Sequence, residues 1–142
     1  SNARPLLIEC WSTRNPQRPS SKLLLKYGDD LRKDAAVLLF FRFINHILKT
    51  HANGAGVRYR GELVASLVYQ VIPMMDKFGG IELVDECIRI ADIQKLETAK
   101  KKEDVMMNRL IASAVGSYLC AYIVGCRDRH HDNILIKQDE WV

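Results

Sequence analysis

A stretch of seventeen residues without a formal charge, Leu110 to Cys126, constrains the fold of this chain more than any other feature. Its length lies at the lower edge of the ~17–25 residues that a helix needs to span a bilayer. Serine and glycine interrupt the apolar pattern, and Arg109 and Arg127 flank the stretch as they would flank a buried helix. We therefore expect a central core helix from about Val105 to Gly125, and no transmembrane segment.

The overall composition is typical of one globular domain. Hydrophobic residues make up 48% of the 142 positions and charged residues 27%, which excludes a disordered tail, collagen, a coiled coil and a mini-protein. The net charge of +4 is too small to indicate nucleic acid or a membrane surface. The four cysteines show no metal-ligand or disulfide spacing, so we interpret them as reduced intracellular thiols. Residues 1–3 resemble the scar of tag cleavage, and no signal peptide follows them.

The first half of the chain reads as two strands followed by a long helix. Short apolar runs predict strands at 6–11 and 22–26, joined by a turn-rich connection at 12–21. A turn and an N-cap at 28–30 then begin a helix that runs from about 31 to 51. This helix is apolar on nearly every face in its first half, so we expect it to be sandwiched between other elements.

The second half is expected to contain shorter elements around the core helix. The first is a helical segment or strand edge at 62–66, followed by a strand at 67–75 with Pro73 at its end or on an unpaired edge. A turn at Gly79-Gly80, an extended piece at 81–84 and a helix at 85–94 come next. The last are a polar linker or helix start at 97–104, with Asp104 as its N-cap, and a buried strand at 133–136.

The densest polar cluster is Arg127 to Asn133, seven consecutive polar residues between an apolar helix and an apolar strand. A loop held at both ends is a common mount for catalytic groups. Its carboxylate and amide oxygens suit Mg²⁺, while histidine and aspartate suit proton transfer near neutral pH. The alternative is a salt-bridged surface turn.

A second cluster surrounds the junction between the second strand and the long helix. Lys26 closes the strand, where a lone ammonium needs an anion, and a phosphate ~4 Å away would contribute a Coulomb term of roughly 4 kcal/mol at an effective dielectric near 20. Asp34, one turn into the helix, could orient Lys26 as the strand lysine and helix carboxylate do in kinases. The alternative is an ordinary capped helix with exposed charges.

Together, GDDLRKD at 28–34 and DRHHDN at 128–133 resemble the signature of the phosphatidylinositol 3-/4-kinase superfamily. The stretch from Tyr69 to Gln94, with DKFGGIELV and IADIQ, is similar to the adenine-pocket strand and hinge of phosphatidylinositol 3-kinases. The resemblance covers most of residues 4–137. It implies an α+β, two-lobed kinase-like core, with an antiparallel-sheet N-lobe, one long helix and the hinge in 4–84, and a mostly helical C-lobe in 85–142.

The resemblance also implies site residues. Lys26 would hold the ATP phosphates, with Asp34 and Tyr69 lining the inner pocket. The Glu82 carbonyl and the Val84 N–H would hydrogen-bond the adenine edge. The residues that would pack on the adenine faces are Leu24, Ile81, Leu83 and Leu135. The catalytic residues would be Asp128, Arg129 and His130, with Asp128 and His130 assisting deprotonation of the acceptor, and Asn133 would coordinate Mg²⁺.

The implied activity is ATP-dependent phosphorylation of the inositol ring of a phosphatidylinositol lipid, by a cytoplasmic protein that is peripheral at membranes. A regulatory protein subunit is a possible partner, and nucleic acid is not. Arg127 is more like the 4-kinases, and VIPM at 71–74 resembles related protein Ser/Thr kinases, so these acceptors stay open. A nucleotide-binding pseudokinase or scaffold and a helical interaction domain are further alternatives.

The chain departs from the family pattern in three places. Only residues 1–3 precede the strand before which the family carries its phosphate-binding loop. The sequence stops before the position of the Asp-Phe-Gly metal ligand, and the stretch 94–109 is shorter than usual. We therefore expect a fragment of a longer kinase that transfers phosphate weakly or not at all by itself.

Overall fold

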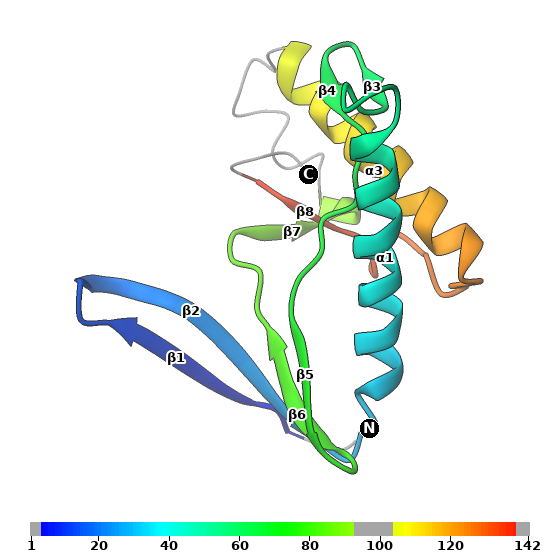
Figure 1. Ribbon diagram of the computed structural model, residues 1–142. Helices are drawn as coiled ribbons and strands as arrows, with labels where there is room; N and C mark the ends of the chain where they lie inside the picture. The colour runs from blue at the N-terminus through cyan, green and yellow to red at the C-terminus, as the bar shows by residue number, and fades with distance from the viewer. Residues whose placement is uncertain (1–3, 93–103, 139–142) are drawn as a thin grey trace. The chain divides into compact units, whose positions relative to one another are not determined.

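The structure is a computed structural model that describes residues 4–92 and 104–138. In that part the chain is α+β, with a four-stranded antiparallel sheet and two α-helices (Figure 1). It divides into two compact units, Ser1–Leu39 with Val68–Val84, and Phe40–Leu67 with Asp85–Val142. The proposed tag scar at 1–3 and most of the predicted polar linker, 97–103, lie outside the described residues.

The sheet of the first unit has the strand order β1-β2-β6-β5 (Figure 1). Strand β1, Leu6–Ser12, pairs with β2, Asn15–Tyr27, so most of the predicted connection at 12–21 is strand. The sequence at 12–21 predicts a turn-rich connection because of its proline and serine content, but the structure extends both strands into it. The pairing is irregular there, since the register shifts beside Trp11, which lies opposite Pro19. A proline lacks the N–H of a regular ladder and is accommodated at such a bulge.

The predicted turn at Gly79-Gly80 is wrong. Both glycines lie inside strand β6, Phe78–Glu82, and the chain turns at Asp76-Lys77. A Cβ on Gly79 would lie 2.5 Å from the Ile72 carbonyl oxygen, and one on Gly80 would lie 2.6 Å from the Leu23 Cδ2. These glycines therefore permit close packing of the sheet.

Strand β5, Val71–Met75, is the last strand in the order of this sheet. Pro73 lies within it, opposite Gly79 of β6. The predicted unpaired edge at Pro73 is therefore confirmed, because a proline is tolerated where its missing N–H faces away from a neighbouring strand.

Helix α1, Arg32–Thr50, begins where the sequence predicts it. Its cap is Asp30, whose Oδ1 accepts a 3.1 Å hydrogen bond from the Arg32 N–H. Leu38 and Phe41 are buried, whereas Leu39 and Phe43 are 64% and 57% exposed. The expectation that this helix is sandwiched between other elements is therefore not met in the described part of the chain, because its apolar residues are buried along one side only.

The core of the second unit lies between helix α3, Asp104–Ile123, and the segment at 57–67. Here β3, Arg58–Tyr59, and β4, Glu62–Leu63, form a short hairpin that contacts α3. A Cβ on Gly116 would lie 2.5 Å from the backbone carbon of Ala65, so the helix and this segment approach closely.

Helix α3 is buried along one side only. Ala112 and Cys120 are fully buried, and burial raises the pKa of the Cys120 thiol. Val115, Tyr118 and Tyr122 are exposed on the other side. Within the residues searched, no helix combines the length and the apolarity that crossing a membrane requires.

The predicted helix at 85–94 is wrong as far as the structure describes it. Cys87–Arg89 form strand β7, followed by a short 3₁₀ helix, η1, at Ile90–Asp92. Strand β7 pairs antiparallel with β8, Leu135–Lys137. The predicted strand at 133–136 is therefore present, but it begins two residues later and ends one residue later than predicted. Pairing with a segment almost fifty residues away overrides the local helical spacing.

Candidate functional site

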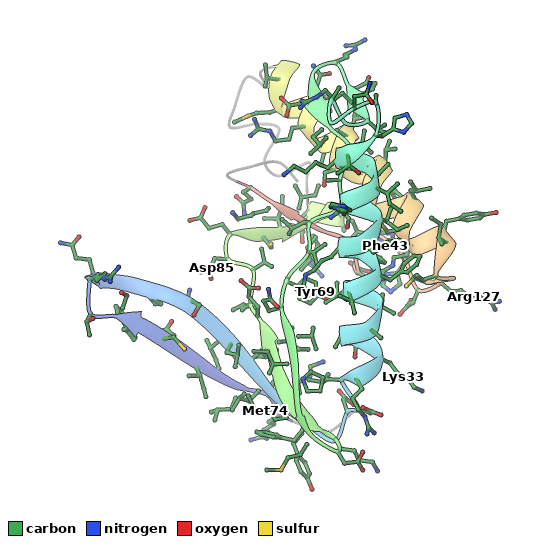
Figure 2. All side chains as sticks on the ribbon, in the orientation of Figure 1. Lys33, Phe43, Tyr69, Met74, Asp85 and Arg127 are labelled. Atoms are coloured by element: carbon green, nitrogen blue, oxygen red, sulfur yellow. The ribbon has the colours of Figure 1, made fainter. Side chains whose placement is uncertain are left out.

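The polar loop at 127–133 is held at both ends by backbone hydrogen bonds. At the end of α3, Gly125 has a φ of 69°, the Cys126 N–H donates to the Ala121 carbonyl at 2.9 Å, and the Gly125 N–H donates to the Tyr122 carbonyl at 3.1 Å. This is a Schellman cap, which requires a residue with positive φ. At the other end, the Ile90 N–H donates to the Ile134 carbonyl at 2.9 Å. Figure 2 labels Arg127 at the start of this loop.

Within the loop, three of the predicted site residues come together. The Asn133 Nδ2 donates to the Asp128 Oδ2 at 2.9 Å, and the Asn133 N–H donates to the His130 carbonyl at 2.9 Å. The His130 Nε2 lies 3.5 Å from the Asp128 Oδ1. Arg129 is exposed and pairs with no residue that the structure describes. The loop therefore assembles one carboxylate, one imidazole and one carboxamide.

Two further charged residues extend this group. Asp132 lies 3.8 Å from a ring nitrogen of both His130 and His131, and its Oδ1 is 3.6 Å from the Arg89 Nη1. Sequence reasoning assigned no role to Arg89. It lies in strand β7, where the sequence predicts a helix, and no local signal links it to the loop.

In the first unit, the sheet register places Lys26 on the same face as two residues of the predicted adenine pocket. Leu24 lies opposite Ile81, and Lys26 lies opposite Gly79. Since strand side chains alternate between faces, Leu24, Lys26 and Ile81 share one face. A Cβ on Gly79 would lie 2.9 Å from the Leu31 Cδ1, so the buried start of the α1 region covers part of this face.

The ion pair of Lys26 is with Asp29, at 3.8 Å, rather than with Asp34. Asp34 is exposed in the first turn of α1. The side chains of Lys26 and Asp29 are 36% and 41% exposed, so water screens the pair and it contributes at most about 1 kcal/mol.

The neighbouring carboxylate of Asp30 accepts hydrogen bonds from both the side chain and the backbone of Arg32. The Arg32 Nε lies 2.7 Å from the Asp30 Oδ1, and the Arg32 Nη2 lies 2.7 Å from the Asp76 Oδ1. The side-chain hydrogen bond from Arg32, with the backbone hydrogen bond second, lowers the pKa of Asp30 to about 2. These contacts join the helix start to the β5–β6 turn.

The predicted hinge follows directly on strand β6. The Glu82 N–H donates to the Gln70 carbonyl at 2.8 Å, and the Leu83 N–H donates to the Lys22 carbonyl at 2.9 Å. The Val84 N–H has no acceptor among the described residues. Tyr69 lies in the segment that leads into β5, as Figure 2 shows.

Leu83 and Leu135, the other two residues of the predicted adenine pocket, are both exposed. Leu83 follows β6 in the first unit, and Leu135 begins β8 in the second.

A metal ion would find few ligands in the loop. Among the residues searched, no group of three or more His, Cys, Asp or Glu side chains is placed to hold one. Asn133 fits the predicted role in part. Its Nδ2 is engaged with Asp128, which leaves its carbonyl oxygen, a donor that hard cations prefer.

An α+β chain whose rigidly held loop presents aspartate, histidine and asparagine together has the groups used in phosphoryl-transfer sites. The chain is 26% identical over 191 aligned positions to "Phosphatidylinositol 3-kinase age-1" of Caenorhabditis elegans, covering 98% of this chain and 15% of the relative. It is 29% identical over 173 positions to "Serine/threonine-protein kinase MEC1" of Candida albicans, covering 81% and 7%. It is 27% identical over 155 positions to "Phosphatidylinositol 3-kinase C2 domain-containing subunit gamma" of Rattus norvegicus, covering 96% and 10%.

No family model matches the chain. The relatives nevertheless confirm that the chain is similar to the phosphatidylinositol 3-/4-kinase superfamily over most of its length. The chain spans 15% or less of the length of these three relatives. Each alignment has more positions than this chain has residues, so each relative contains residues without a counterpart here.

Proposed function

We propose that this chain is the ATP-binding and catalytic-loop part of a longer kinase that phosphorylates the inositol ring of a phosphatidylinositol lipid. The observation that carries the proposal is the hydrogen-bonded group of Asp128, His130 and Asn133 in a loop fixed at both ends. The similarity to kinases over most of the chain supports it.

The proposed base is Asp128. The Asp132 N–H donates to the His130 Nδ1 at 3.3 Å, so in this arrangement Nδ1 is an acceptor, and the other ring nitrogen, Nε2, lies 3.5 Å from the Asp128 Oδ1. Asn133 then orients the Asp128 carboxylate through a hydrogen bond, and His130 lies beside it. The carboxylate keeps free lone pairs with which to accept the proton of an acceptor hydroxyl. Phosphoryl transfer needs little more from the protein than such positioning and charge neutralisation.

We propose that Lys26 binds the phosphates of ATP, with Asp34 and Tyr69 beside them. The weak, screened pair between Lys26 and Asp29 can open for a phosphate at little cost. The Val84 N–H and the Glu82 carbonyl would bind the adenine edge, and the unused Val84 N–H supports this. Asn133 would supply one oxygen to Mg²⁺, and bound Mg²⁺ would neutralise charge on the phosphates.

The proposed acceptor follows the worm and rat relatives, whose names state phosphatidylinositol 3-kinase. Such a substrate would bring the protein to a membrane surface. The rat relative is named a subunit, which supports a regulatory protein partner. A serine or threonine hydroxyl of a protein is the second candidate, because the Candida relative is named a serine/threonine-protein kinase.

The test uses the full-length protein of which we propose this chain to be a part. Incubation with labelled ATP and Mg²⁺ should label phosphatidylinositol in vesicles and leave a serine/threonine peptide pool unlabelled. Asp128→Ala should reduce kcat by ~10²–10⁴-fold, the usual contribution of a general base. Lys26→Ala should raise KM for ATP. Arg109→Ala, which removes an ion pair to Glu62, is the matched control and should change neither.

Unchanged lipid phosphorylation in both Lys26→Ala and Asp128→Ala would refute the assigned roles. Labelling of the peptide pool alone would establish the protein-kinase alternative. A rise in melting temperature with ATP but no transfer would indicate a pseudokinase, because a ligand that binds only the folded state stabilises it by ~2.7 kcal/mol at 100 times Kd. The absence of any such rise would favour a helical interaction domain.

A further inference from the structure

Asp132 occupies the centre of a charged network beside the proposed base. One of its carboxylate oxygens lies 3.8 Å from the His130 Nδ1 and 3.8 Å from the His131 Nε2, and the other lies 3.6 Å from the Arg89 Nη1. Its backbone N–H donates to the His130 Nδ1 at 3.3 Å. The placement of Asp132 therefore sets the orientation of the His130 ring.

Arg89 is itself held in place before it reaches the loop. Strand pairing fixes its backbone opposite Leu135 in β8. Its Nε and Nη2 both lie 2.8 Å from the Asp92 Oδ2 at the end of η1, which leaves Nη1 for Asp132. A hydrogen bond of 3.4 Å from the Ala91 N–H to the His131 carbonyl joins the same short helix to the loop. The Arg89 guanidinium is thus held by strand β7 and by Asp92, and from there it contacts Asp132 in the loop.

We propose that Arg89 is a positioning residue that acts through Asp132 to hold His130 against Asp128. The inference rests on the proposed function for its kinetic consequence, although not for its geometry. The side chains of Arg89 and Asp132 are 54% and 48% exposed, so their ion pair is screened and contributes little to folding. Their role is orientation of the ring, since small misplacements of catalytic groups strongly reduce rate.

The first arm of the test needs no activity. Backbone ¹⁵N order parameters of His130 and Asp132 are measured in the 142-residue chain. In the wild type they should lie near ~0.85, the value of rigid backbone, and in Arg89→Ala they should fall below ~0.6. Arg89→Lys retains a positive charge, but its single ammonium cannot contact Asp92 and Asp132 together, so it should restore only part of the order. Arg109→Ala, which breaks the ion pair to Glu62 in the same unit, should leave the loop unchanged.

The second arm uses the full-length protein. Arg89→Ala should lower kcat by about tenfold with an unchanged KM for ATP and an unchanged melting temperature. Asp132→Ala should have the same effect, and the double variant should lose no more than either single variant, because both act on one ring.

Rigid loop order parameters in Arg89→Ala would overturn the inference, as would an equal loss of order in Arg109→Ala. Additive losses of kcat in the double variant would also overturn it, because they would show independent roles. A wild-type protein without phosphotransferase activity would refute the proposed function alone, and the order parameters would still decide the positioning role.

Discussion

The Asn133 side chain donates a 2.9 Å hydrogen bond to the Asp128 carboxylate, which lies five residues earlier in the same loop. The bond closes the loop on itself and orients both groups. It engages the nitrogen of the Asn133 amide and leaves its oxygen for another ligand. The Asp128 carboxylate also lies beside the His130 ring. A variant that removes the charge at position 128 but keeps the shape of the side chain can therefore separate the effect of charge from the effect of geometry.

Asp128→Asn removes the charge at position 128 and keeps the shape of the side chain. The new side chain keeps an oxygen to accept the Asn133 hydrogen bond but lacks the basic carboxylate. We expect kcat of the full-length protein to fall by ~10²–10⁴-fold, as for loss of a general base, with an unchanged melting temperature. Steady-state kinetics with thermal unfolding check this. Retention of wild-type kcat in Asp128→Asn would show that transfer does not need a basic group at this position.

Asn45→Ala should destabilise the second unit. The Asn45 side chain donates to the Ser66 carbonyl and accepts from the Ser66 N–H, both at 2.8 Å, and Ser66 is buried. Removal of the amide leaves two buried backbone groups unsatisfied, so the free energy of unfolding should fall by ~1–3 kcal/mol. Urea titration measures it. His46→Ala changes the exposed neighbour and should stay within ~0.5 kcal/mol of the wild type. Equal stability of both variants would contradict the prediction.

Gly116→Ala tests the close approach of α3 to Ala65. Alanine normally favours a helix interior over glycine by up to ~1 kcal/mol. Here the added Cβ would lie 2.5 Å from a backbone carbon, so something must shift, and overpacking of this kind costs ~1–3 kcal/mol. We therefore expect net destabilisation, measured by urea unfolding. Val115→Ala, on the exposed side of the same helix, is the control. A more stable Gly116→Ala would show that the helix can move away freely.

The charge of Asp30 should make stability depend on pH in acid. The pKa of Asp30 is lowered from 3.8 to about 2 in the folded protein, chiefly by the hydrogen bond from Arg32. A lowered pKa contributes stability that is fully present above the unfolded value and is lost as pH falls through the folded value. The stability advantage of the wild type over Asp30→Asn should therefore shrink as the pH falls from about 4 to about 2.

Asparagine is a good N-cap, so this variant removes the charge and keeps the cap. Urea midpoints at several pH values and low salt give the comparison. Added salt should reduce the difference, because Asp30 is exposed to solvent screening. A difference between the two proteins that stays constant across this pH range would show that the Arg32 contact does not form in solution.

Both long helices could be predicted from the sequence, because their signals are local. The cap at Asp30 and the uncharged run before Arg127 act within a few residues of the helices that they delimit. The loop that carries Asp128, His130 and Asn133 was predictable for the same reason, since its polar residues are consecutive and lie between apolar segments. The resemblance to the kinase superfamily rests on such contiguous motifs.

The positions of β7, of the two glycines in β6 and of Arg89 depend on partners far along the chain. Cys87–Arg89 has helical spacing but becomes a strand because 135–137 pairs with it. Gly79 and Gly80 read as a turn, yet neighbouring strands pack where their side chains would be. Local sequence signals are therefore sufficient to locate the two helices and the polar loop. The strand pairing and the contact between Arg89 and Asp132 follow from the folded arrangement of the chain, because such contacts gain their energy from groups that no local pattern brings together.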